Sequence, residues 1–122
     1  MDEMTEEKAL ALVEEGLVSE HSLPVKLRMG DGLDVPMLER TKAALEFLAE
    51  HYRGRDTVPK RLAFATVDLT ATLTSRDYPT ELWYQVQAAS DQLVDLAYSI
   101  FDAESYGARA EDGTDAGDDR RR

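Results

Sequence analysis

Residues 79–101 read PTELWYQVQAASDQLVDLAYSIF, and they carry the most regular apolar pattern in the chain. Apolar side chains recur there alternately four and three positions apart, at Leu82, Val86, Ala89, Leu93, Leu96 and Ile100. This spacing places them in one stripe along an α-helix, and such a stripe needs partner helices to cover it. We therefore predict an all-α, four-helix bundle-like domain in which the longest helix begins after Asp77-Tyr78-Pro79 and ends near Gly107.

Three more helices are predicted upstream of this stretch. The first is short and starts at Thr5, a side chain that can cap a helix. The second starts at Asp34-Val35-Pro36, an acidic cap with proline in the first turn, and ends near Gly54. Thr57-Val58-Pro59 repeats this opening, so we expect a third helix over residues 57–73.

Two segments leave a strand open as an alternative. Residues 23–29 alternate apolar and polar side chains, which indicates a short extended segment, and residues 63–73 also alternate with a period of two and are rich in threonine. The alternative fold is therefore α+β, with short strands at 23–29 and 63–73. The proline-containing opening favours a helix for the second segment.

Length and charge predict one domain and exclude several classes of function. The 122 residues suit a single helical domain over residues 1–106, followed by a disordered, charged tail over 107–122. Residues 1–106 contain 20 acidic and 10 basic residues, and the whole chain has a net charge of -11. Such a body repels phosphate backbones, so we expect no nucleic-acid partner. The chain lacks a long apolar run and a basic, apolar leader, so we expect no membrane partner and a cytoplasmic location.

The last helix carries more apolar surface than its stripe. Four aromatic side chains widen its apolar arc and are our candidate partner-binding residues: Trp83, Tyr84, Tyr98 and Phe101. Aromatic side chains favour interfaces because they combine a large apolar area with a polar group. The leading hypothesis is therefore a non-enzymatic, intracellular protein-binding module, a regulator, adaptor or neutralising partner, with a basic protein as its target and a homodimer as a second option.

A competing hypothesis is a small helical enzyme or a ligand-binding domain for an anionic molecule. Its candidate anion-binding residues are the cations at the junction of the second and third helices: Arg53, Arg55, Lys60 and Arg61. Asp68 stands among apolar residues and is a candidate buried acid, which would need a partner or a raised pKa. Neither His21 nor His51 has an acid three positions before it, and the chain has no cysteine, so we predict no metal and no cofactor.

Overall fold

The computed structural model describes residues 3–74 and 77–102, which form six α-helices and no β-strand. The helices are α1 (Glu6–Leu17), α2 (Leu23–Arg28), α3 (Val35–His51), α4 (Lys60–Thr66), α5 (Leu69–Thr74) and α6 (Thr80–Phe101). The predicted all-α, bundle-like fold is confirmed. The last helix ends at Phe101, with Asp102 as its C-cap, and so is shorter than the predicted helix that ended near Gly107. The predicted disordered tail over 107–122 lies outside the described residues.

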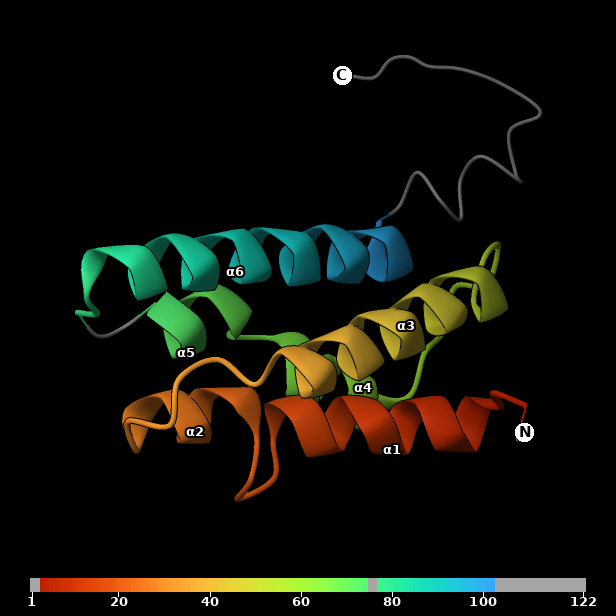
Figure 1. Ribbon diagram of the computed structural model, residues 1–122. Coiled ribbons are helices and arrows are strands. Elements are labelled where there is room, and N and C mark those ends of the chain that lie inside the picture. Colours follow the sequence, from red (N-terminus) through yellow and green to blue (C-terminus); the bar gives the residue numbers. More distant parts are fainter. Residues whose placement is uncertain (1–2, 75–76, 103–122) are drawn as a thin grey trace, which may run out of the picture.

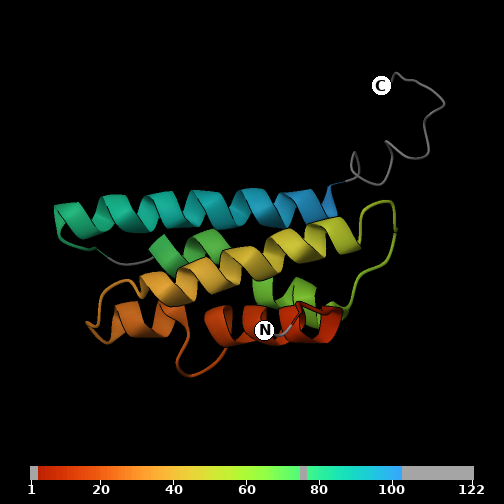
Figure 2. The ribbon, with the colours of Figure 1, turned by 45° about the vertical axis from the view of Figure 1, so that its right-hand side comes forward.

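The three long helices form successive layers (Figures 1 and 2). The central layer is α3, which packs against α1 on one side and α6 on the other. The short helices complete the bundle at its sides: α4 packs against α1, and α5 packs against α6 and α2. The two halves of the segment 60–74 therefore belong to different layers.

The core follows the stripes read from the sequence. The largest side chains with almost no exposed surface include Val13 of α1, Leu45 and Leu48 of α3, and Val86 and Leu93 of α6. Within the α6 stripe, Val86, Ala89, Leu93 and Ile100 are buried, and Leu82 and Leu96 are half-buried. Burial of these apolar side chains is the main source of stability, because it removes their surface from water.

Side-chain caps start the first and the third helix as expected. The Lys8 backbone N–H donates to the Thr5 hydroxyl oxygen at 3.2 Å, and the Met37 backbone N–H donates to Asp34 Oδ1 at 3.0 Å. Lys26 Nζ also lies 2.6 Å from Asp34 Oδ2, which ties α2 to the start of α3. The hydrogen bond from Lys26 is the main reason why the pKa of the Asp34 carboxyl lies below its ordinary value.

The prediction of an extended segment over residues 23–29 is wrong, because Leu23–Arg28 is the helix α2. Pro24 stands in its first turn, and Leu23 and Leu27, four positions apart, are both buried. An alternating pattern over so few residues also fits the four-residue spacing of a helix. The burial of both Leu23 and Leu27 favours the helix over the strand.

Residues 63–73 are helical as we favoured, but the single helix expected over 57–73 is divided in two. The first of the two helices, α4, begins only at Lys60, after Pro59, and ends at Thr66. Val67 and Asp68 form a turn before α5. Proline has the same place at α6, which begins at Thr80 with Pro79 in the capping position. Proline therefore precedes these two helices, whereas in α3 it lies inside the first turn.

Candidate functional site

The break at Val67–Asp68 creates the most distinctive surface feature of the molecule. Before it, α4 buries Leu62 and Ala65 and packs on α1; after it, α5 buries Leu69 and Leu73 and packs on α6. Because α4 follows α1 away from α6, the C-terminal turns of α6 are left partly uncovered on that side.

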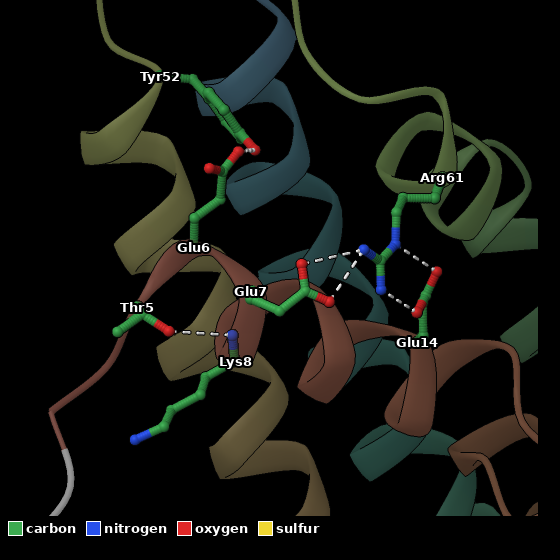
Figure 3. A network of polar contacts seen from close by, with 7 residues as sticks. All are labelled: Thr5, Glu6, Glu7, Lys8, Glu14, Tyr52 and Arg61. Carbon is green, nitrogen blue, oxygen red and sulfur yellow. Dashed lines mark hydrogen bonds and ion pairs between the residues drawn. The ribbon is translucent and has the colours of Figure 1, made fainter.

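Arg61 fastens α4 to α1 (Figure 3). Its guanidinium donates to both carboxylate oxygens of Glu14, at 2.9 Å from Nε and 2.7 Å from Nη2. It also donates to Glu7 at 3.2 Å from Nη1. The hydrogen bond from Arg61 is the main reason why the pKa of the Glu14 carboxyl is lowered. This group, which we call the Arg61 clasp, fixes the position of α4 beside the break.

An open apolar groove of about 680 Å³ lies between the break and the C-terminal half of α6. Its floor and walls come from both sides of the break and from one face of α6: Ala63, Thr66, Val67, Asp68, Leu69, Thr70, Ala71, Val94, Ala97, Tyr98 and Phe101. We call it the α4–α6 groove. Its volume is typical of binding sites, and its lining is mostly apolar with a few polar groups at defined positions.

Large apolar side chains in the α4–α6 groove are unusually exposed. The exposed fraction is 74% for Val67, 66% for Tyr98 and 42% for Phe101. A second, smaller depression lies on the other side of Val67 and is lined in part by Phe64, which is 71% exposed. Exposed apolar surface of this kind is typical of interaction sites.

Carboxylates border the α4–α6 groove on two sides. Asp68 lines it at the break. On α6, Asp91 stands three positions before Val94 and Asp95 three positions before Tyr98, so both aspartates lie on the helix surface next to groove residues. All three are exposed, and none of them forms a side-chain hydrogen bond or ion pair with another described residue. The helices α5 and α6 contain no Lys or Arg.

The four aromatic side chains predicted as a partner-binding set are divided by the structure. Tyr98 and Phe101 lie together in the α4–α6 groove, whereas Trp83 and Tyr84 lie near the start of α6 and do not line it. Trp83 is half-buried and stacks on Tyr78, with ring centroids 6.4 Å apart. Tyr84 is 67% exposed, about as much as Tyr98.

The residues of the competing hypothesis do not share one pocket among those found in the described part of the chain. Arg61 is bound in the Arg61 clasp, and Arg53 pairs with Glu50 of α3 at 2.9 Å. The pKa of the Glu6 carboxyl is lowered mainly by the hydrogen bond from Tyr52, and the positive charge of Arg55 lowers it further. Lys60 is exposed at the start of α4 and lies outside the groove.

Asp68 is also not the buried acid considered from the sequence. It is exposed at the break, where water solvates the carboxylate, so no buried partner is needed. His51, at the end of α3, stacks on Phe47 with ring centroids 5.7 Å apart and lies 3.6 Å from Glu6. It therefore belongs to the contact between α1 and α3.

Sequence reasoning did not select Val67 and Phe64 as site residues. A signal for them existed, because both lie off the stripe of Leu62, Ala65, Leu69 and Leu73 and are large apolar residues. In the sequence alone the same pattern also fits a strand over residues 63–73, so it does not by itself indicate exposed surface.

The described helices and acidic side chains also bear on membranes and metals. Within residues 3–74 and 77–102, no helix combines the length and apolarity required to cross a bilayer. In the same part of the chain, no three His, Asp or Glu side chains gather in a way that could hold a metal ion. Compared with family models, curated proteins and solved structures, the chain matches none of them.

Proposed function

We propose that the protein is a non-enzymatic, intracellular protein-binding module whose α4–α6 groove receives a basic partner protein. The observation that carries this proposal is the exposure of Tyr98, Phe101 and Val67 in an apolar groove bordered by exposed carboxylates. Apolar contacts supply affinity when a partner covers this surface, and the carboxylates favour a cationic partner over an anionic one.

The ligand-binding alternative has less support. Two of its four cations already pair with carboxylates, in the Arg61 clasp and between Arg53 and Glu50. An anion would have to compete with these carboxylates for the guanidinium groups, and the negative charge of the body opposes its approach. A rise in the melting temperature of the protein on addition of phosphate or nucleotides would favour the ligand-binding alternative instead.

Affinity capture tests the proposal with two matched variants. The tagged protein is mixed at moderate salt with an extract of the cells from which it comes, as wild type, as Tyr98→Ser and as Tyr84→Ser. The two tyrosines are on the same helix and equally exposed, but only Tyr98 lines the groove. Both substitutions remove one aromatic ring from the surface, so they differ only in position.

We expect the wild type and Tyr84→Ser to retain a stoichiometric partner that Tyr98→Ser loses. Retention of no stoichiometric partner, or equal retention by all three proteins, would contradict the proposed function. Circular dichroism of the three proteins confirms that each variant keeps its helices, which we expect because both side chains are exposed.

A further inference from the structure

We propose that the occupant of the α4–α6 groove is an amphipathic helix of about two turns, with Lys or Arg on both sides of its apolar stripe. This inference rests on the proposed function, because it names the kind of partner segment that the groove receives.

The first observation is the length of α6 that borders the groove. The residues of α6 that line it run from Val94 to Phe101, a stretch of eight residues that at a rise of about 1.5 Å per residue is roughly 12 Å long. A helix of about two turns has the same length. Its apolar residues, three and four positions apart, would face Val94, Ala97 and Phe101.

The second observation concerns the backbone. The groove is formed by α4, α5 and α6, whose backbone groups bond mainly within their own helices, and the described residues contain no strand. An extended peptide would therefore bury unpaired N–H and C=O groups against an apolar surface, which costs free energy. A helical occupant brings its own backbone hydrogen bonds and avoids this cost.

The third observation is that acids lie on both walls. Asp68 stands on the wall formed by the break, and Asp91 and Asp95 stand on the α6 side. A helix lying between the walls meets carboxylates along both edges of its apolar stripe. Cations on only one edge would leave the other wall unmatched, so the charges favour an occupant that is basic on both sides.

A second copy of the chain fits this surface poorly. A symmetric pair would bring the same aspartates of both copies together, in a protein whose net charge is already -11. Like charges placed opposite one another oppose association, whereas a basic helix relieves the same repulsion.

The test uses three fluorescein-labelled synthetic peptides and the full chain, with binding measured by fluorescence anisotropy. The first peptide has Leu at positions i, i+3, i+4 and i+7, with Lys on both sides of this stripe. The second is a scrambled peptide of the same composition, and the third has Glu in place of Lys. Each is titrated with wild type, Tyr98→Ser and Tyr84→Ser.

We expect the patterned basic peptide to bind at least about tenfold more tightly than either control peptide. Tyr98→Ser should weaken this binding, and Tyr84→Ser should leave it unchanged. Raising the salt from about 50 mM to about 200 mM should also weaken it, because the carboxylates are exposed. Equal binding of the scrambled peptide, binding that ignores Tyr98→Ser, or no binding would overturn the inference.

The outcomes separate this inference from the proposed function. If affinity capture finds a partner that depends on Tyr98 while the patterned peptide fails to bind, the groove receives a different kind of segment and only the inference is overturned. If neither capture nor the peptide depends on Tyr98, both are overturned. Sedimentation of the unlabelled chain completes the test, because a dimer that Tyr98→Ser abolishes would also overturn the inference.

Discussion

A single close contact sets the distance between α1 and α3. Gly16 of α1 is buried and lies against Thr41 of α3, and a Cβ added at Gly16 would overlap the Thr41 hydroxyl oxygen. That hydroxyl donates to the Met37 carbonyl oxygen at 2.9 Å, so it is fixed in place. The glycine is therefore needed here for close approach, since α1 and α3 could not otherwise pack at this distance.

Gly16→Ala is expected to lower the free energy of unfolding by about 1–3 kcal/mol, because the added methyl group overpacks the contact. In a Thr41→Ala background, Gly16→Ala no longer places a methyl group against a hydroxyl group. The higher helix propensity of alanine than of glycine at position 16 then offsets part of the remaining cost of that substitution. Urea unfolding of both single variants and the double variant measures the coupling. Additive effects of the two substitutions would show that Thr41 does not limit this contact.

At the other end of α1, Tyr52 connects α1 to the end of α3 (Figure 3). Its ring is buried, and its hydroxyl donates to Glu6 Oε2 at 2.5 Å. This hydrogen bond is the main reason why the pKa of the Glu6 carboxyl lies below its ordinary value of 4.5. Burial, and then the same hydrogen bond, raise the pKa of the Tyr52 hydroxyl, so the tyrosine stays neutral and remains a donor.

This lowered pKa predicts a pH-dependent difference between wild type and Tyr52→Phe. The folded pKa of Glu6 lies below the unfolded one, so the stabilisation is fully present above pH 4.5 and is lost as the pH falls through the folded pKa. Wild type should therefore be more stable than Tyr52→Phe at neutral pH, and the difference should shrink as the pH falls below 4.5. Unfolding measured at a series of pH values tests this, and a difference that does not change with pH would contradict it.

Among the helices, the pair α4 and α5 is the least predictable from the sequence and the most important for the groove. Their separation depends on two different partners, since α4 packs on α1 and α5 on α6. The Arg61 clasp holds the first of these contacts through Glu14 and Glu7. We therefore expect the groove to depend on a polar contact made on the opposite side of α4.

Arg61→Met is expected to loosen α4 while α6 stays protected. Hydrogen exchange of the amides from Ala63 to Thr66 should become faster, because the clasp no longer opposes local opening. Lys60→Met is the matched control: Lys60 is the neighbouring cation, exposed and without an ion pair to another described residue. Equal exchange in the two variants would show that burial of Leu62 and Ala65 alone holds α4 in place.

The same helices show how far the sequence could predict the fold and the site. The stripe of α6 and the caps Thr5 and Asp34 are local features, and the structure confirms them. The break has neither glycine nor proline at Val67–Asp68 and arises from tertiary packing, which no local pattern encodes. Tyr98 and Phe101 were found because they lie off the stripe, but the opposite wall of their groove was missed because it is formed by the break.

At the scale of the whole molecule, charge is distributed unevenly over the layers. Residues 67–102, which include α5 and α6, contain six acidic residues and one basic residue, Arg76. Residues 3–66 contain twelve acidic and nine basic residues. The apolar α4–α6 groove thus lies in the more acidic part of the chain, where repulsion opposes contact between copies even though the exposed aromatic surface favours it.

We therefore expect the protein to be a monomer at low salt and to self-associate when the border of the groove is neutralised. The variant Asp68→Asn/Asp91→Asn/Asp95→Asn keeps the shape of these side chains and removes three negative charges, so the apolar surface can pair with its own copy. Sedimentation velocity over a range of concentrations measures the change, and adding Tyr98→Ser to the triple variant should restore the monomer. A wild-type dimer at low salt, or a triple variant that stays monomeric at high concentration, would show that these carboxylates do not control self-association.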